Sequence, residues 1–207
     1  TSCAPVSSYP YFDDFEGKEA GFVAQCYEPL DFVGPYSTLY AMFMHDASHS
    51  NSGEVMFGAG YGSYTTTPGS VSGGPVGFMK KFHLSSAMAY EVGIYAKKEP
   101  STWNDNSYEV QFVLCSAADV ENKTIFGRVP VTEETYGKRV SYLKVAEDGD
   151  YYIGVMGYKD GGSSFYPLFD DFSVNELTIT PPTGINVTNI SSTGAKVEFT
   201  KVGALTE

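Results

Sequence analysis

Apolar and polar residues alternate along most of this chain, which is the pattern of a β-strand with one buried face. In residues 108–114 every second side chain, from Tyr108 to Leu114, is apolar, whereas Glu109 and Gln111 point the other way. Apolar residues rarely recur at the spacing of three to four residues that a helix would show. The alternation therefore predicts an all-β protein, with strands in residues 9–16, 37–45, 54–61, 76–84, 88–97, 108–114, 124–131, 137–146, 150–158 and 166–179.

Segments rich in Gly, Pro, Asn, Asp and Ser separate the predicted strands, because these residues adopt the backbone angles that turns require. They cover residues 45–53, 65–75, 98–106, 147–150 and 159–164. Asp148 and Gly149 stand between two apolar segments, and this dipeptide favours a tight hairpin between the strands on either side. Many short strands with irregular loops are typical of a sandwich or a jelly roll.

The composition changes towards the end of the chain. Residues 180–182 include tandem prolines, which cannot lie in a central strand, so we expect a linker there. Two further alternating segments follow, and two strands are too few to bury a core. We therefore expect residues 183–207 to begin a second domain and residues 9–179 to form the first. Residues 1–8 are expected to form a linker before it.

The charge of the chain excludes one class of partner. Asp and Glu number 25 against 13 Lys and Arg, and the net charge of −12 would repel a phosphate backbone, so nucleic-acid binding is not expected. The same charge disfavours anionic membranes, and no apolar segment is long enough to insert as a membrane-spanning helix. The hydrophobic fraction of 42%, with 16 Tyr and 14 Phe, favours a folded β core.

The three cysteines, Cys3, Cys26 and Cys115, are too few for a disulfide framework, although one bridge remains open. Cys115 follows Leu114 in an apolar segment and is expected to be a small buried residue. The first residues contain neither a basic region nor an apolar stretch, so we do not expect them to form a signal peptide. We expect either that such a peptide has been removed or that the chain is a piece of a longer protein.

Three short motifs occur in a fixed order along the chain. They are YPYFDDFEG at 9–17, GDYYIGVMGY at 149–158 and LFDDFSV at 168–174. Together they resemble the choice-of-anchor J domains of secreted proteins from gut and oral Bacteroidetes. Those domains are similar to the cleaved-adhesin domains of gingipain haemagglutinins and more distantly to MAM domains. The resemblance covers residues 9–179. It implies a two-sheet jelly-roll sandwich, concanavalin-like or galactose-binding-like, in a secreted or cell-surface protein that takes part in adhesion.

The segment PPTGINVTNISSTGAKVEF at 181–199 resembles the opening of a fibronectin type III domain. Phe199 stands where such domains commonly carry Trp. Fibronectin type III domains frequently follow choice-of-anchor J domains in the same chain. The resemblance therefore implies that residues 183–207 are a truncated segment of such a domain, and that further domains of the parent chain are neighbours of this module.

Carboxylates near both ends of the first domain form a candidate metal site. Glu16 ends the first predicted strand, Asp170 and Asp171 lie in the last, and Asp14 is a further candidate ligand. The first and last strands of a jelly roll are often neighbours, and Ca²⁺ prefers carboxylate and carbonyl oxygens. Because adjacent strand residues face opposite sides, only one of Asp170 and Asp171 is expected to face Glu16. In families that resemble this one, a structural calcium ion joins these strands. The alternative is that the carboxylates are simply solvated.

Residues near predicted loops form a candidate ligand surface. Trp103, Asn104 and Asp105 combine a flat ring with amide and carboxylate groups, which is the chemistry that stacks on a sugar ring and binds its hydroxyls. Tyr158 and Tyr166 also fall near predicted loops. The alternative is that Trp103 packs over the edge of a sheet.

Motifs for catalysis are absent from the sequence. It contains no G-x-S-x-G nucleophile elbow and no H-E-x-x-H zinc helix. His45, Asp46 and His49 fall in a predicted loop, where their spacing does not align them as metal ligands, so a polar loop is the preferred interpretation. We therefore expect a non-enzymatic module that recognises an extracellular protein or a glycan. The alternatives are a carbohydrate-binding accessory module of a larger secreted enzyme, a spacer domain, and a glycoside hydrolase.

Overall fold

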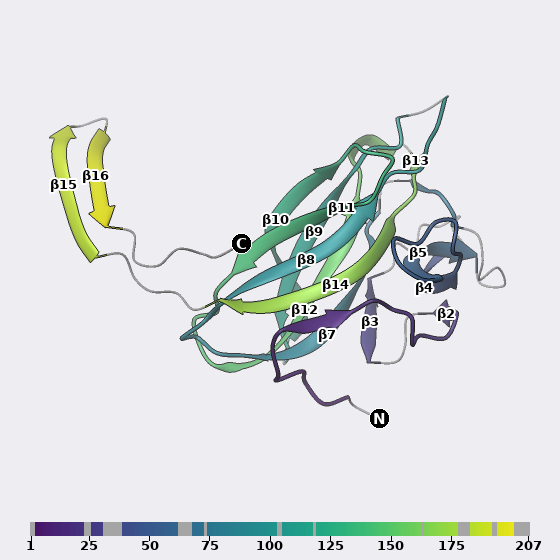
Figure 1. Cartoon of the computed structure of the whole chain (residues 1–207), viewed down its shortest axis with the longest axis horizontal. Helices are drawn as coiled ribbons and strands as arrows, with labels where there is room; N and C mark the ends of the chain where they lie inside the picture. The colour runs from purple at the N-terminus through teal and green to yellow at the C-terminus, as the bar shows by residue number, and fades with distance from the viewer. Residues whose placement is uncertain are drawn as a thin grey trace. The chain divides into compact units, whose positions relative to one another are not determined.

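The computed structural model describes most of the chain, namely residues 3–22, 26–30, 39–61, 68–72, 74–102, 105–117, 119–162, 164–177, 183–191 and 194–200. The chain divides into two units, Thr1–Glu176 and Leu177–Glu207. The first unit contains two β-sheets that face each other (Figure 1). Among the described residues the only helical element is the short 3₁₀ turn η1 (Asp160–Gly162). No helix in these ranges is long and apolar enough to cross a membrane.

We name the two sheets of the first unit after their central strands. The β12 sheet has the strand order β10-β9-β12-β7-β3. Its strands are β3 (Tyr27–Leu30), β7 (Val76–Leu84), β9 (Tyr108–Ser116), β10 (Asp119–Val131) and β12 (Gly149–Tyr158). The β14 sheet has the order β11-β8-β14-β5-β4-β2, and β1 also pairs with β14. Its strands are β1 (Tyr11–Asp13), β2 (Gly21–Phe22), β4 (Leu39–His45), β5 (Val55–Tyr61), β8 (Ala89–Lys97), β11 (Gly137–Leu143) and β14 (Leu168–Leu177).

Two small pairs of strands complete the described structure. In the first unit, β6 (Val71–Ser72) pairs with β13 (Ser164–Phe165). The second unit contains the antiparallel hairpin of β15 (Thr183–Ser191) and β16 (Gly194–Thr200). Both alternating segments expected near the end of the chain are therefore strands.

The prediction of an all-β, two-sheet sandwich is confirmed. Every strand that the alternation predicts is present, although several differ in length from the prediction. The strands β2, β3, β6 and β13 were not predicted, because each carries too few residues to show a period.

The hairpin predicted at Asp148 and Gly149 is wrong. β11 pairs with β8 in one sheet, whereas β12 pairs with β7 and β9 in the other, so this connection crosses between the sheets. The Asp148 carboxylate accepts hydrogen bonds from the backbone N–H and the hydroxyl of Ser86, at 2.6 and 2.8 Å. The residue that favoured a hairpin here fixes the neighbouring turn between β7 and β8 instead.

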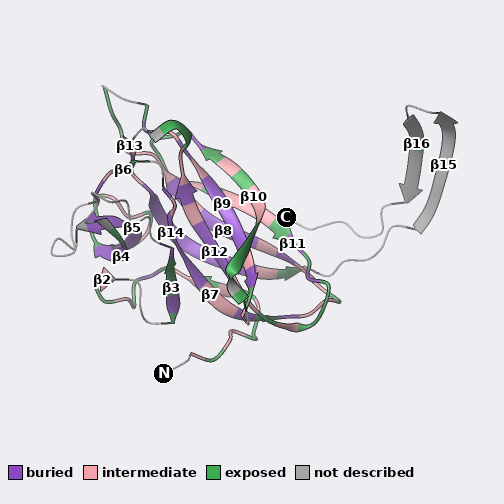
Figure 2. Ribbon diagram, turned by 180° about the vertical axis from the view of Figure 1, so that it is seen from behind, coloured by how far each residue is buried: buried purple, intermediate pink, exposed green. Residues whose placement is uncertain are grey.

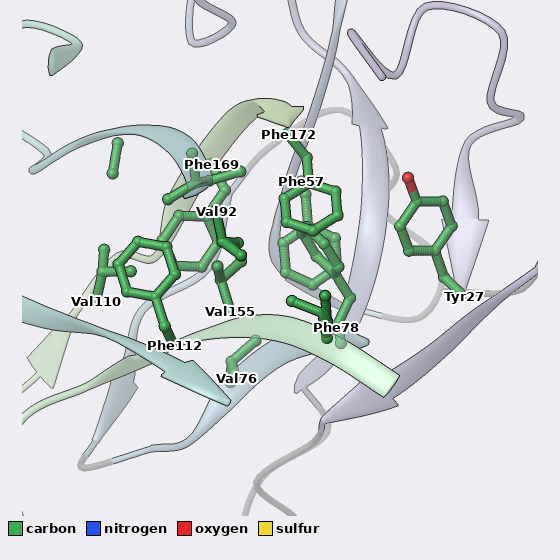
Figure 3. Close-up of a cluster of buried hydrophobic side chains, with 14 of the residues drawn as sticks. Tyr27, Phe57, Val76, Phe78, Val92, Val110, Phe112, Val155, Phe169 and Phe172 are labelled. Atoms are coloured by element: carbon green, nitrogen blue, oxygen red, sulfur yellow. The ribbon is translucent and has the colours of Figure 1, made fainter. Parts of the chain in front are cut away.

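Aromatic rings fill the space between the sheets (Figure 3). Phe78 of β7 is fully buried, and its ring centroid lies 4.9 Å from Phe57, 5.1 Å from Phe172 and 5.2 Å from Tyr27. The ring planes cross at 76° to 90°, which is the favoured edge-to-face arrangement. Because these rings come from β3, β5, β7 and β14, they hold both sheets in a single core.

Two strands share one edge of β14. β5 pairs with it at Leu168 and Phe169, and β1 pairs with it from Phe172 to Val174. The expected adjacency of the first and last strands of the domain is therefore confirmed. Residues 170–171 lie between these two ladders.

The N-terminal segment is held against the β12 sheet. A disulfide joins Cys3 to Cys26, with a Cα–Cα distance of 5.5 Å. The Val6 N–H donates to the Lys81 carbonyl at 3.0 Å, and the His83 N–H donates to the Val6 carbonyl at 2.8 Å. The one bridge that the cysteine count left open is thus present. Cys115 is buried as predicted, and burial raises the pKa of its thiol.

Candidate functional site

The first candidate region contains the carboxylates of Glu16, Asp170 and Asp171, which accept hydrogen bonds from one loop near the place where β1 and β5 meet the same edge of β14. We call these three residues the carboxylate cluster. Asp170 is fully buried and Asp171 is 7% exposed. Buried carboxylates require hydrogen-bond donors or cations, because desolvation disfavours their charged form. Loop 46–54, which leads into β5, supplies donors to this cluster.

Asn51 and Ser52 of this loop bind both aspartates. One carboxylate oxygen of Asp170 accepts hydrogen bonds from the backbone N–H groups of Asn51, at 2.7 Å, and Ser52, at 3.1 Å. Asp171 accepts hydrogen bonds from the Asn51 amide, at 2.6 Å, and the Ser52 hydroxyl, at 3.0 Å. Each of these four donors is electrically neutral. Asp170 and Asp171 therefore hold the loop in place through Asn51 and Ser52. Both carboxylates are buried, and none of these four donors brings a positive charge to them.

The backbone of Asp171 explains why both side chains reach one loop. Its φ of 52° lies in the left-handed region, which interrupts the alternation of β14. Asp170 and Asp171 therefore do not point to opposite sides of the strand, contrary to the expectation from sequence. Burial raises the pKa of Asp170 to about 7, and the charge of Asp171 adds to the rise. The N–H donors of Ser52 and Asn51 oppose it.

Glu16 contacts the same loop at its next residues. Its carboxylate accepts hydrogen bonds from the N–H of Glu54, at 2.9 and 3.0 Å, and from the N–H of Val55, at 2.8 Å. Gly53 has a φ of +57°, and a Cβ there would lie 2.2 Å from the Glu16 carboxyl carbon. Glycine is therefore what allows Glu16 to approach the loop.

The structure places Asp14 differently from the other candidate ligands. Its carboxylate accepts a hydrogen bond from the Glu16 N–H at 3.2 Å and so closes a local, exposed turn. Among the described residues, no three Asp, Glu, His or Cys side chains lie close enough together to hold a metal ion. The expected convergence of Glu16 with Asp170 and Asp171 in one metal-binding group is therefore not found. A calcium ion held by the two aspartates would need carbonyl or hydroxyl oxygens as further ligands, which calcium accepts.

The two histidines beside this loop have separate partners. His49 faces Asp46 through Nδ1 at 2.6 Å and Glu99 through Nε2 at 3.3 Å. The Nε2 atom of His45 lies 3.2 Å from the Lys18 carbonyl oxygen. This agrees with the prediction of a polar loop.

The second candidate region is the outer face of the β12 sheet. Ile153 and Val155 of β12 point into the core, so Tyr152, Gly154, Met156 and Tyr158 face outward. A small apolar cluster covers this face, with Leu30, Met79, Val113 and Cys115 buried and Ile125, Tyr152 and Met156 packed against them. Figure 2 shows mainly buried residues on β9 and a mixture of buried and intermediate residues on β12, whereas β10 and β11 mix intermediate and exposed ones.

One open depression, of about 240 Å³, lies at the end of β12, and we call it the Tyr158 depression. Besides Tyr158 it is lined by Glu109, Arg128, Lys159 and Asp160 among others. Arg128 donates a hydrogen bond to Glu109 at 2.8 Å. The Asp160 carboxylate accepts a hydrogen bond from the Tyr158 hydroxyl, and this bond raises the pKa of Tyr158. The ring is thus flanked by polar groups that partners already hold in place.

A second depression, of about 350 Å³, contains Tyr152 and is called the Tyr152 depression. Its lining also includes Leu30 and Met79 from the floor and Glu121 and Lys123 from β10. The pairing of β10 with β9 breaks between residues 119 and 124, so Glu121 and Lys123 lie on a bulge. Bulges commonly redirect side chains in this way.

The predicted ligand residues do not all come together. Asp105 lies beside the Tyr158 depression, because the Lys159 ammonium group donates a hydrogen bond to the Asp105 carbonyl. Tyr166 instead packs against a cluster of Met42, Met44, Met56 and Leu168, which belong to the β14 sheet. Trp103 and Asn104 lie outside the described residues.

The sequence alone does not indicate several residues of the outer face. Tyr152 and Arg128 lie inside predicted strands, whereas the predicted ligand residues fall near loops. The usable signal was the alternation itself, because Tyr152 and Tyr158 share the face that Ile153 and Val155 do not.

Comparisons with known proteins place the fold. No family model matches the sequence, and no curated protein sequence matches it. Among solved structures, the CBM22-1 xylan-binding domain from Paenibacillus barcinonensis Xyn10C is similar, with 12% identity and a TM-score of 0.54. The match covers 86% of this chain and 100% of that domain. The K2 cleaved adhesin domain of Lys-gingipain matches with 10% identity and a TM-score of 0.53, over 81% of this chain and 98% of that one.

An enzyme is also among the similar structures. The arabinose-bound MgGH51 α-L-arabinofuranosidase matches with 16% identity and a TM-score of 0.54, over 81% of this chain but only 26% of the enzyme. This chain therefore spans about a quarter of that protein. The described structure is an all-β, two-sheet sandwich of the galactose-binding-like or jelly-roll type, with the fold of the CBM22 and cleaved adhesin domains.

Proposed function

We propose that the first unit is a non-catalytic, extracellular glycan-binding module that holds its ligand on the outer face of the β12 sheet. The observation that carries this proposal is the Tyr158 depression, where an aromatic ring lies beside the ion pair of Arg128 and Glu109. The similar structures named above include binding modules, one for xylan and one from an adhesin, which supports the general role. The Cys3–Cys26 disulfide is consistent with secretion.

The chemistry of the Tyr158 depression suits a sugar. An aromatic ring offers an apolar surface to the C–H groups of a sugar, and planar charged groups bind its hydroxyls. Glu109 accepts hydrogen bonds from Arg128 at 2.8 Å and from Gln111 at 2.7 Å. These contacts hold the polar groups in place before a ligand arrives, which lowers the entropy cost of binding.

The same contacts disfavour a glycoside hydrolase at this place. Such an enzyme needs a carboxylic acid whose pKa is raised, so that it stays protonated as the general acid. Glu109 instead accepts hydrogen bonds from Arg128 and Gln111.

A matched pair of tyrosine variants tests the glycan-binding proposal. We expect Tyr158→Ala to weaken binding to a soluble xylan, β-glucan or mannan about tenfold, because it removes the stacking surface. The control is Tyr142→Ala on β11, where the ring is 58% exposed but belongs to the β14 sheet. Calorimetric titration with each polysaccharide measures both effects. Equal losses in the two variants would contradict the assignment of the face. If the module bound an extracellular protein and none of the polysaccharides, the proposed ligand would be a protein and not a glycan.

We also propose that the carboxylate cluster binds a structural Ca²⁺ ion. Glu16, Asp170 and Asp171 all contact one short loop, and the donors that reach the two buried aspartates are neutral. A divalent cation would supply the positive charge that these donors lack. Carboxylates with further loop oxygens make up the donor set that calcium prefers.

The calcium proposal predicts a change in thermal stability. We expect EDTA to lower the melting temperature and added Ca²⁺ to restore it, because an ion that binds only the folded state stabilises that state. Asp171→Asn should remove the response to Ca²⁺. Asp14→Asn should retain it, because Asp14 only closes a local turn. A melting temperature unaffected by EDTA, or an equal loss of the response in both variants, would contradict the site.

A further inference from the structure

We infer that the ligand is an extended, neutral oligosaccharide that lies along β12, with one end in the Tyr158 depression and the other in the Tyr152 depression. This inference rests on the proposed glycan-binding function. It adds a second contact site, a minimum ligand length and the direction of the ligand on the sheet.

Both depressions belong to the same strand and the same face. Tyr152 and Tyr158 stand six residues apart on β12, and an even separation in a strand places both side chains on one side of the sheet. At about 3.3 Å per residue, the two positions lie roughly 20 Å apart. A mono- or disaccharide is too short to reach both rings, whereas a longer linear oligosaccharide spans them.

The surface between the two rings is apolar. The outward positions there include Gly154 on β12 and Gly77 on β7, which pairs with Met156. A Cβ at Gly154 would lie 2.0 Å from the Phe78 carbonyl oxygen, and one at Gly77 would lie 2.0 Å from the Val155 carbonyl oxygen. Both positions therefore exclude a side chain, and the side chains of Met79 and Met156 lie against them. Buried Val113 and Met79 close the floor.

The charges around the two depressions favour a neutral ligand. Glu109 and Asp160 face Arg128 and Lys159 around the Tyr158 depression, so the charges of these four residues cancel. At the other depression Glu28 and Glu121 stand with Lys123. An anionic or cationic polymer would meet like charges along its path, whereas sugar hydroxyls accept hydrogen bonds from the cations and donate them to the carboxylates.

An extended peptide fits this surface less well than a sugar. Peptides that bind β-sheets usually add a strand at a sheet edge, where backbone N–H and C=O groups are open to pairing. The strands β7, β9 and β12 are paired on both sides, so the face that they form presents side chains. This arrangement supports recognition by ring contacts and hydroxyl hydrogen bonds.

A series of ligand lengths tests the inference. The probes are di-, tetra- and hexasaccharides of xylose, glucose and mannose, titrated calorimetrically into the whole chain. We expect the best-bound hexasaccharide to bind at least tenfold more tightly than its disaccharide. Tyr152→Ala should remove this gain from length, and Tyr158→Ala should weaken every length. Tyr152 packs against a buried cluster, so Lys123→Ala on the exposed bulge serves as a second variant and should reduce the gain from length.

The results of this titration series test the second contact site and the glycan-binding function separately. Equal affinity for the disaccharide and the hexasaccharide would overturn the second contact site while glycan binding at Tyr158 stands. The same holds if both Tyr152→Ala and Lys123→Ala keep the full gain from length. Stronger binding of a uronic-acid hexasaccharide than of any neutral one would overturn the neutral ligand. Failure of every saccharide and polysaccharide to bind would overturn the proposed function itself.

Discussion

Gly53 illustrates how a single residue leaves room for one carboxylate of the cluster, that of Glu16. Its left-handed backbone suits glycine, and a side chain there would meet the Glu16 carboxylate, which binds the N–H groups of Glu54 and Val55. The sequence does not indicate the contact between Gly53 and Glu16, because the two residues are far apart along the chain. What the sequence does show is the acidic residues themselves.

Gly53→Ala is predicted to destabilise the fold by about 1–2 kcal/mol, because an alanine in the left-handed region is strained. Displacement of Glu16 from its hydrogen bonds should add to this loss. Gly17→Ala is the matched control, since no atom lies within 4 Å of a Cβ built there. Chemical denaturation monitored by fluorescence measures both variants. Similar free energies of unfolding for the two would show that the approach of Glu16 to the loop contributes nothing.

Phe78 is predicted to be among the most sensitive positions of the core. Phe78→Ala should cost about 3–5 kcal/mol, because it removes a buried ring and leaves a cavity between four aromatic neighbours. Phe12→Ala should change the free energy of unfolding by less than about 0.5 kcal/mol, because Phe12 is 60% exposed. Urea unfolding distinguishes the two. A small effect at Phe78 would mean that the two sheets do not share the core described above.

At the scale of elements, the long strands followed from the alternation of the sequence and the connections did not. Residues 76–84 were predicted with their observed bounds, because every second position carries an apolar residue except at Lys80, and those apolar residues are buried. The crossing between β11 and β12 was missed, because Asp-Gly is favoured in hairpins and Asp148 here binds a different turn. The bulge of residues 120–123 was also missed, since a bulge depends on the partner strand.

The disulfide is predicted to stabilise the N-terminal elements of the first unit. It closes a loop between residues 23 positions apart, and restricting such a loop in the unfolded chain stabilises the fold by about 3 kcal/mol. The double variant Cys3→Ser with Cys26→Ser should therefore melt several degrees below the wild type. A reducing agent should lower the melting temperature of the wild type but not of this variant. An equal response in both would show that the lower melting temperature does not come from cleavage of this disulfide.

At the scale of the whole first unit, the sandwich separates two roles. The β1, β5 and β14 ends gather the carboxylate cluster, whereas the β12 sheet presents rings and charged pairs on its outer face. The sequence indicated the acidic residues of the first region, because short motifs mark both ends of the domain. It did not indicate the loop that binds them. It did not predict the second as a surface, because Tyr152, Arg128 and Lys123 are brought together only by the order of strands in the sheet.

The most direct test of this account is a map of amide chemical shifts during titration with the best-bound hexasaccharide. We predict that the changes concentrate along β12 from Tyr152 to Tyr158 and on Arg128 of β10, because the ligand is proposed to lie there. Amides of β8 and β11, on the other sheet, should remain unchanged. Changes confined to those strands or to loop 46–54, without changes on β12, would contradict the proposal that the ligand binds along β12.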